Sequence, residues 1–377
     1  MCKGTRLLTR RPCPSALALM QISTVRDARI DFARGLALLI IFTDHVYGNA
    51  LSAFMPLSLC YTSMAEVFVF LSGYVGGQSY RRVFQRGGFL ECLQKAIRRC
   101  IQVYFAHIST SAIVLAILIA WARSIDASDA SVFPGYTAFQ LDGWRFLIGV
   151  LALTRKVSDF DILPVYLSLL PALPAILFLE SRWSILLPIT SVAVYVMANG
   201  LRLYLFPRWP WTFNPFAWQL LFVAGVMLGI PAVKKMRLLP EGMVAVVVSF
   251  LILEFLFCGK LFAPELIPWT ERENLELTRV LHFACVVILA RSILRRFEFA
   301  NANWARPILL CGRNSLATYC AGAVIANVLS LAGSHLGYSY DYSWSLLVNG
   351  IGWLGCIGSA WISEKIGRRR RDVGSQQ

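Results

Sequence analysis

Apolar stretches of roughly 17–25 residues recur along the whole chain, and each is long enough to cross the ~30 Å of hydrocarbon in a bilayer. Hydrophobic residues make up 57% of the 377 residues. A soluble domain of this length would need far more polar surface. The sequence therefore predicts an all-α, polytopic integral membrane helix bundle.

The predicted membrane segments number ten, and the charges between them indicate their direction. The connection after the first segment, from about Gly48 to Tyr61, carries no charge, whereas the connection after the second is rich in Lys and Arg. Basic residues also follow the sixth and eighth segments and close the chain. Because basic loops stay in the cytosol, both termini are predicted to be cytosolic. The ten segments are residues 30–47, 62–80, 101–121, 162–179, 183–201, 213–230, 241–258, 278–294, 307–331 and 343–363.

The net charge of +15 does not indicate a nucleic-acid partner. The basic residues lie in short connections between apolar stretches, as expected for the cytosolic face of a membrane protein. The predicted macromolecular surroundings are thus a lipid bilayer and no nucleic acid. The basic residues after the second segment include Arg81, Arg82, Arg86, Lys95, Arg98 and Arg99.

One membrane domain over residues 26–366 is predicted, between a disordered basic cytosolic tail at 1–25 and a basic cytosolic tail at 367–377. The ten cysteines are scattered singly along the chain. No C-x-x-C pair and no His/Cys ligand spacing occurs, so the sequence predicts neither a disulfide framework nor a metal site.

Two longer connections, residues 122–161 and 259–277, are predicted to face outward. Both mix acidic with aromatic residues. They either shape an entrance on the external face or serve as solvated connectors. Within the first of them, Leu147 to Leu153 is apolar but too short to cross, which favours a re-entrant or interfacial turn.

The first predicted segment contains Asp31, Arg34, Asp44 and His45 in otherwise apolar sequence. A charge within a membrane helix costs ~2.5–3.5 kcal/mol on insertion scales, so such residues usually face a protein interior and act there. At 100° per residue, Asp27, Asp31, Arg34 and His45 share one face, and His45 lies ~16 Å beyond Arg34 along the axis. The alternatives are an interfacial anchor and helix cap for the first three, and a structural, hydrogen-bonded role for His45.

Glu66 in the second segment is predicted to lie at a depth similar to that of His45. A carboxylate beside an imidazole fixes its tautomer and raises its basicity, which suits a general base. The nearby Ser72, Gly73 and Gly76 would also permit close helix approach, and packing is an equally good interpretation of that stretch.

Other polar residues within the apolar segments are weaker candidates. Asn214 and Gln219 open the sixth segment and offer buried donors, although a proline near a helix start is also structurally ordinary. Arg313 lies early in the ninth segment, where it either meets a phosphate or follows the positive-inside rule. Three further residues fit a cavity or helix–helix bonds equally well: Glu254, Arg279 and His282.

These motifs resemble the OpgC family of membrane succinyltransferases, which modify osmoregulated periplasmic glucans. The second segment is also similar to an element of the wider acyltransferase-3 group. The similar blocks follow the family's chain order from the first to the ninth segment. They are Arg26-Asp27-x-Arg29-Ile30-Asp31-Phe32-x-Arg34-Gly35-Leu36-Ala37 with Phe42-x-Asp44-His45, then Ala65-Glu66-Val67-Phe68-Val69-Phe70-Leu71-Ser72-Gly73-Tyr74, Asn214-Pro215-Phe216-Ala217-Trp218-Gln219 and Gly312-Arg313-Asn314-Ser315-Leu316.

The resemblance implies an enzyme of the bacterial inner membrane. Its donor would be an acyl-CoA from the cytosol, succinyl-CoA, with no tightly bound cofactor, and its acceptor a hydroxyl of a periplasmic glucan or related glycan. His45 would be the general base, with Asp44 or Glu66 orienting its ring. A cytosolic rim of arginines suits CoA phosphates, which Arg binds bidentately. The expected substrate-binding residues are Arg34, Asp31, Arg81, Arg313, Asn214 and Gln219.

Two alternatives remain open on the same residues. In the first, the histidine itself carries the acyl group before passing it on. In the second, the protein is a proton-coupled transporter or flippase in which Asp44, His45 and Glu66 form a proton relay.

Overall fold

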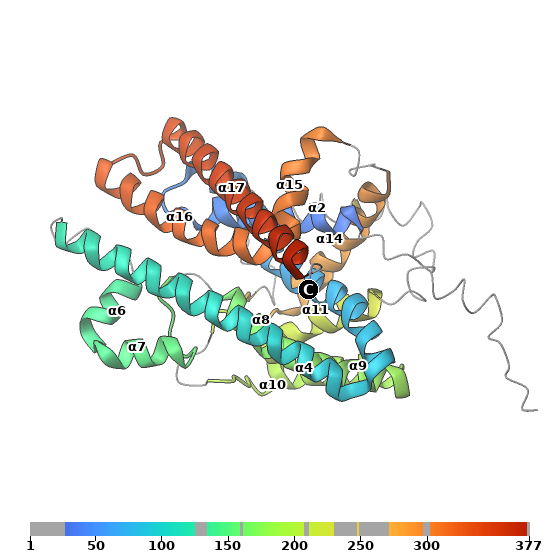
Figure 1. Ribbon diagram of the computed structural model, residues 1–377. Helices are drawn as coiled ribbons and strands as arrows, with labels where there is room; N and C mark the ends of the chain where they lie inside the picture. The colour runs from blue at the N-terminus through green and yellow to red at the C-terminus, as the bar shows by residue number, and fades with distance from the viewer. Residues whose placement is uncertain are drawn as a thin grey trace, which may run out of the picture.

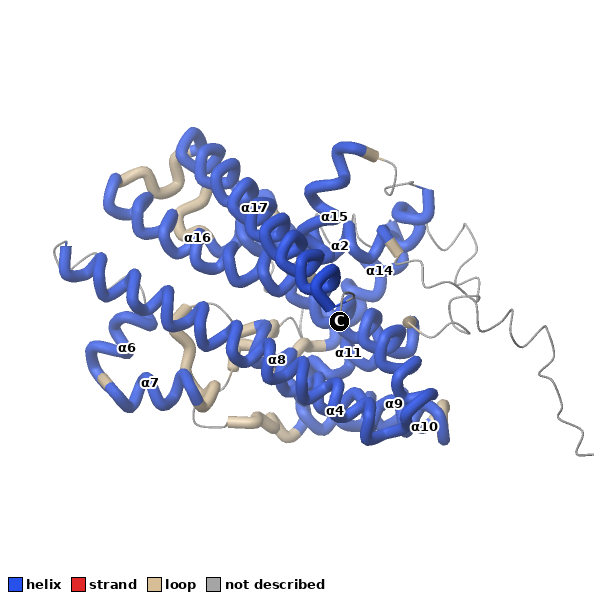
Figure 2. The backbone as a smooth tube through the Cα atoms, in the orientation of Figure 1, coloured by secondary structure: helices blue, strands red, loops and turns tan. Residues whose placement is uncertain are grey.

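The computed structural model describes residues 27–124, 134–158, 161–206, 211–229, 247–248, 271–296 and 302–374. Regular structure in these residues is helical, and none of them forms a strand (Figure 2). The predicted all-α class is confirmed. The predicted tail at 1–25 and, apart from residues 247–248, the predicted helix at 241–258 lie outside the described residues.

Figure 1 shows how the helices are arranged in space. The first half of the chain contains α2 (Ala28–His45), the 3-10 helix η1 (Ala50–Phe54), α3 (Pro56–Leu59), α4 (Met64–Ser124), α6 (Pro134–Asp142), α7 (Trp144–Leu151), α8 (Ile162–Leu169), η2 (Leu170–Ala172) and α9 (Leu173–Arg182). The second half contains α10 (Leu186–Gly200), α11 (Pro215–Leu228), α14 (Leu277–Arg296), η4 (Asn303–Ala305), α15 (Arg306–Arg313), α16 (Ser315–Leu336) and α17 (Tyr342–Gly374).

Helices α2, α15, α16 and α17 pack together in the upper part of Figure 1. Small residues allow the backbones of α2 and α15 to touch. A Cβ atom on Gly35 would collide with the carbonyl oxygen of Ile308, and one on Gly312 with the carbonyl oxygen of Asp31. This close packing fixes α2, the helix that carries Asp31, Arg34, Asp44 and His45, against the C-terminal half of the chain.

A second group consists of α4 with α8, α9, α10 and α11, in the lower part of Figure 1. Its centre is the contact between α4 and α11, where Gly73 faces the carbonyl oxygen of Phe222 and Gly225 faces that of Phe70. Trp218 is buried beside this contact. Because α4 also packs against α2 and α16, it joins the two groups into one bundle.

Three predicted boundaries differ from the structure. The basic stretch after the second predicted segment is helical, and α4 is interrupted only at Gly88, which has φ +72°. Arg, Lys and Gln favour helix, while glycine adopts a positive φ at little cost. The predicted helix 307–331 is divided into α15 and α16 at Asn314. The predicted helix 162–179 is divided by η2, where Pro171 and Pro174 cannot donate backbone hydrogen bonds.

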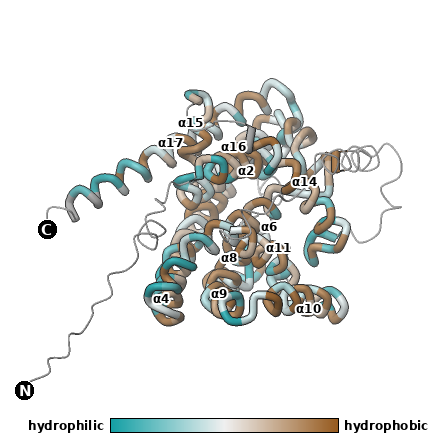
Figure 3. Tube along the Cα trace, turned by 90° about the vertical axis from the view of Figure 1, so that its right-hand side faces the viewer, coloured by the Kyte–Doolittle hydropathy of each residue, from teal (hydrophilic) through white to brown (hydrophobic). Residues whose placement is uncertain are grey.

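Five helical stretches of the described chain are long and apolar enough to cross a membrane: Met64–Arg123, Ile162–Arg182, Leu277–Leu294, Ser315–Leu336 and Tyr342–Arg369. Helices α10 and α11 are shorter apolar helices. Hydrophobic residues recur along most of the helices in Figure 3, while the C-terminal part of α17 is hydrophilic. These features identify a multi-pass membrane protein. The count of ten crossings and the cytosolic termini stay predictions.

Replacing Gly225 tests the contact between α4 and α11. We expect Gly225→Val to reduce the free energy of unfolding by about 1–3 kcal/mol, since the added side chain forces the two backbones apart. Thermal unfolding of the purified protein in detergent measures the change. Gly350→Val is the control, because no atom lies within 4 Å of a Cβ at Gly350 on α17. Equal melting temperatures for the two variants would contradict the role assigned to Gly225.

Candidate functional site

A cavity of about 130 Å³, here called the polar cavity, lies at the C-terminal end of α2. Its walls come from the end of α2, the start of α4, the segments that precede α8, α11 and α14, and Tyr319 near the start of α16. Segments distant in sequence therefore converge on one chamber. The polar side chains that line it are those of Asp44, His45, Ser63, Asp161, Thr212, Arg272 and Tyr319.

The backbone of α2 orients the imidazole of His45. Nδ1 of His45 lies 2.6 Å from the carbonyl oxygen of Ile41. A carbonyl oxygen can only accept, so Nδ1 carries the hydrogen and Nε2 is the basic nitrogen of the neutral ring. His45 lines both the polar cavity and a separate, much smaller pocket that Tyr319 also lines. Its ring therefore borders the protein interior. This is the tautomer that a general base requires.

Asp44 lines the same cavity but does not hold the imidazole. Its Oδ1 atom is buried and accepts no hydrogen bond from the part of the chain that the structure describes. Leaving a buried acceptor without a donor costs about 1–3 kcal/mol. Within the described residues, Asp44 therefore has an unused hydrogen-bond acceptor at the C-terminal end of α2.

Glu66 contacts Arg279 and Ser63 rather than His45. Arg279 donates to Oε1 of Glu66 through Nε at 3.0 Å and also through Nη2. Ser63 donates to Oε2 through its backbone N–H at 2.9 Å and through its hydroxyl. Both carboxylate oxygens are therefore in use, and the prediction that Glu66 orients the imidazole does not agree with this geometry. Glu66 instead fixes Ser63 at the wall of the polar cavity.

A second buried contact lies beside the Glu66–Arg279 pair, one turn further along α14. His282, one turn after Arg279, forms a hydrogen bond through Nδ1 with the hydroxyl of Thr62. Arg279, His282, Thr62 and Glu66 are all buried. The four side chains join the start of α4 to α14, so of the two interpretations of Arg279 and His282, the structure favours helix–helix bonding.

Arg272 and Asp161 belong to the polar cavity, although the sequence did not single them out. The Arg272 guanidinium stacks on Phe213, with its central carbon 4.9 Å from the ring centroid. Burial lowers the pKa of Arg272, while the negative charges of Glu66, Asp161 and Asp44 raise it. Both residues lie in the two long connections, predicted to face outward, that mix acidic and aromatic residues, and this composition was the sequence signal that could have identified them. Their position supports the interpretation of these connections as the lining of an entrance.

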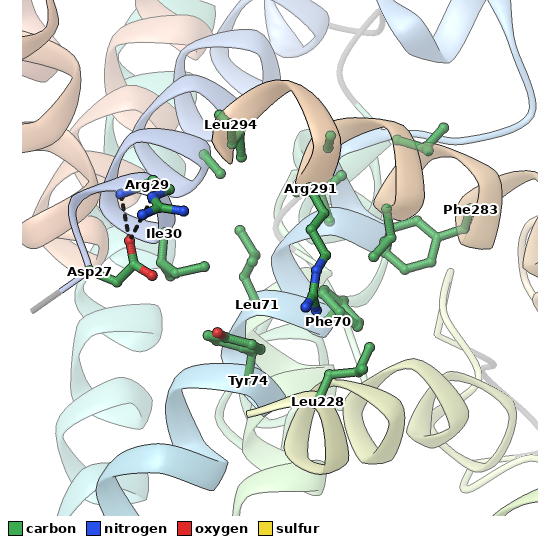
Figure 4. A pocket seen from close by; sticks show the side chains of 15 residues that line it. Asp27, Arg29, Ile30, Phe70, Leu71, Tyr74, Leu228, Phe283, Arg291 and Leu294 are labelled. Atoms are coloured by element: carbon green, nitrogen blue, oxygen red, sulfur yellow. Dashed lines mark hydrogen bonds and ion pairs between the residues drawn. The ribbon is translucent and has the colours of Figure 1, made fainter. Parts of the chain in front are cut away.

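A second cavity, the apolar pocket, lies at the opposite end of α2 and has a volume of about 280 Å³ (Figure 4). It is lined by the start of α2, the stretch of α4 from Val67 to Tyr74, the end of α11 and the stretch of α14 from Phe283 to Leu294. In Figure 4, Arg291 extends from α14 toward Phe70, and Arg29 lies beside Asp27 at the start of α2. The pocket therefore combines apolar walls with cationic groups at the N-terminal end of α2.

The predicted phosphate-binding arginines also gather near this end of α2. Arg34 donates from Nη2 to the hydroxyl of Ser315 at 2.6 Å. Arg313 forms an ion pair with Asp31 at 3.6 Å, and its side chain is about half exposed. These contacts tie α2 to α15 and α16. Arg81, in contrast, pairs with Glu180 of α9 at 2.8 Å.

Asn214 and Gln219 hold helices together in this structure. The amide of Asn214 donates to the carbonyl oxygen of Leu203 at 2.6 Å and to Oδ1 of Asn274 at 2.9 Å, and its oxygen caps the start of α11. Gln219 exchanges two hydrogen bonds with Ser191 of α10. Neither residue lines the polar cavity or the apolar pocket. Their prediction as substrate-binding residues is not supported by these contacts.

Metal-ligating groups are not clustered in the described part of the chain. No set of three or more His, Cys, Asp or Glu side chains there is placed to hold a metal ion. The described cysteines that occur as free thiols are Cys60, Cys92, Cys100, Cys285, Cys311, Cys320 and Cys356.

Comparison with known proteins gives one match. A protein-family model described as "OpgC protein" matches residues 26–368, which is nearly the whole chain. No curated protein and no solved structure matches the chain significantly.

Breaking the buried ion pair tests its structural role. We expect Arg279→Met to lower the free energy of unfolding by about 3–5 kcal/mol, because it leaves the Glu66 carboxylate buried without its cation. Chemical unfolding in detergent measures the loss. The control is Arg202→Gln, which removes an exposed ion pair with Glu271 that solvent already screens. If both variants unfold alike, Glu66 and Arg279 do not stabilise the bundle in the way described.

Proposed function

Since this chain belongs to the OpgC family, we propose that it is a membrane O-acyltransferase that moves a succinyl group from succinyl-CoA to a hydroxyl of a periplasmic glucan. Family membership indicates a membrane acyltransferase that acts on periplasmic glucans. The observation that carries the proposal is the position of His45, which lines the polar cavity and whose Nδ1 faces the Ile41 carbonyl, so that Nε2 is the basic nitrogen. Bacterial inner-membrane location is part of the proposal.

In this mechanism His45 acts as the general base. Nε2 takes the proton of the glucan hydroxyl as its oxygen attacks the thioester carbonyl carbon. The tetrahedral intermediate collapses, the carbon–sulfur bond breaks, and the imidazolium returns the proton to the departing CoA thiolate. The Ile41 carbonyl keeps the Nδ1 hydrogen in place and accommodates the charged ring during the step. In the proposed mechanism direct transfer needs one base, His45, and no acyl-histidine forms.

The donor approaches from the N-terminal end of α2. Ala33 lines the apolar pocket and Asp44 lines the polar cavity. These two residues are separated by eleven positions, which amounts to ~16 Å and only ~20° of rotation on a helix. The two cavities thus lie along one face of α2. The phosphopantetheine arm would occupy the apolar pocket, and its phosphates would meet Arg29, Arg291 and Arg313 at the same end.

The acceptor approaches the polar cavity from the opposite end. Sugar hydroxyls are donors, and the buried Oδ1 of Asp44 is an acceptor that no described group satisfies. We assign Asp44 the role of holding a second glucan hydroxyl, which positions the reacting hydroxyl at His45. This differs from the sequence-based expectation that Asp44 orients the imidazole.

The transporter alternative is less well supported by the same contacts. A relay through Asp44, His45 and Glu66 requires a mobile proton on Glu66. Both oxygens of that carboxylate are bound to Arg279 and Ser63. Release of free CoA by reconstituted protein supplied with succinyl-CoA and glucan favours acyl transfer, whereas movement of substrate without CoA release favours transport.

Removal of the proposed base is the direct test. We expect His45→Ala to reduce acyl transfer by about 10²–10⁴-fold, the usual contribution of a general base. The assay measures succinyl-CoA-dependent CoA release and glucan succinylation by mass spectrometry. His335→Ala is the control, since that ring lies in the last turn of α16 and contacts Trp121. Full succinylation by a well-expressed His45→Ala protein would remove His45 from this role.

The role of Asp44 makes a separate prediction. We expect Asp44→Asn to raise the KM for glucan about 10-fold or more, because a charged hydrogen bond to the acceptor is weakened. The KM for succinyl-CoA should change little. Steady-state kinetics with each substrate varied in turn measure both values, with Asp142→Asn as a control outside the cavity. A rise confined to the KM for succinyl-CoA would contradict the assignment.

A further inference from the structure

Arg272 has donors that the surrounding protein does not use. Its Nε atom is buried and has no hydrogen-bond partner among the residues described. In the described part of the chain the guanidinium of Arg272 forms no ion pair, and it stacks on the face of Phe213. Arginine is a donor with five N–H groups, and buried donors are normally satisfied in proteins. The cavity that Arg272 lines is therefore built for a ligand that accepts hydrogen bonds.

The carboxylates near Arg272 either bind other cations or do not form an ion pair with Arg272 in the described structure. Asp161 binds Lys156 at 2.9 Å. Glu66 binds Arg279. Asp44 acts on Arg272 electrostatically but does not pair with it within the described structure. These carboxylates stabilise the cation without filling its hydrogen-bonding edge.

The direction from which the donor enters brings its acyl group into the cavity that Arg272 lines. This step rests on the proposed function, in which CoA enters from the apolar pocket with its acyl group leading. When the thioester carbonyl reaches His45, the rest of the acyl group projects beyond it into the polar cavity. The far end of a four-carbon acyl chain then lies about 4 Å past the carbonyl carbon, at bond lengths of about 1.5 Å. His45 and Arg272 both line that cavity.

We infer that Arg272 is the specificity-determining residue for the acyl group and binds the terminal carboxylate of a dicarboxylic half-thioester such as succinyl-CoA. A guanidinium matches a carboxylate through two parallel hydrogen bonds. Stacking on Phe213 fixes the plane of the guanidinium and leaves its edge for the ligand. A neutral acyl chain of the same length cannot accept hydrogen bonds from the guanidinium and leaves its N–H donors unsatisfied.

The test compares succinyl-CoA with butyryl-CoA, which has the same chain length and no carboxylate. For Arg272→Gln we expect kcat/KM with succinyl-CoA to fall at least about 10-fold, the effect of losing a charged hydrogen bond. Turnover of butyryl-CoA should fall much less, so the ratio of the two activities reverses toward the neutral donor. Arg272→Lys should recover part of the preference. Arg202→Gln is the matched control, because it removes an exposed cation that binds the neighbouring Glu271.

Parallel loss of both activities in Arg272→Gln would overturn the inference and make Arg272 a structural residue. An unchanged preference for succinyl-CoA would overturn it as well. Binding of free succinate and free butyrate to the purified full chain, followed by calorimetry, provides a second measurement that needs no turnover. If the wild-type protein binds succinate through Arg272 but transfers no acyl group, the proposed function fails and the carboxylate site stands. If succinate binding does not depend on Arg272, the site fails whatever the enzyme transfers.

Discussion

A charge buried among apolar helices is stable only beside an opposite charge, and the buried pair of Glu66 and Arg279 meets this constraint. The pair joins the start of α4 to α14, two elements that are more than 200 positions apart in the chain. Through Ser63 it also fixes one wall of the polar cavity. The cavity in which the chemistry is proposed to occur therefore depends on a contact that is itself remote from the reacting atoms.

Helix α2 connects two different chemical environments. Its N-terminal end lines an apolar pocket bordered by arginines, and its C-terminal end lines a polar cavity with His45. Such different surroundings suit the proposed thioester donor, with its long flexible arm, and the proposed hydroxylated acceptor. Close backbone contact at Gly35 and Gly312 holds α2 against α15, so that this helix is a rigid support for both cavities.

Sequence reasoning predicted that His45 faces the protein interior, and the structure finds it lining a cavity, but the partners of the polar groups were not predicted. The placement of His45 in the protein interior followed from the cost of leaving a polar group in lipid. The partner of Glu66 could not be found in this way, because any of several distant cations would have satisfied its charge. Asn214 and Gln219 were assigned to substrate for the same reason: a buried amide indicates that a hydrogen bond exists but does not say with what.

Hydropathy and the distribution of charge determined that this chain is a helical membrane protein, because both depend on local sequence and on the properties of the bilayer. Family motifs in chain order determined its family. The convergence of Asp44, His45, Asp161 and Arg272 on one cavity was decided by the tertiary structure alone. These residues come from connections and helices whose relative positions depend on how the helices pack. The sequence shows that a helix has an apolar face, but it does not show which neighbouring helix that face will contact.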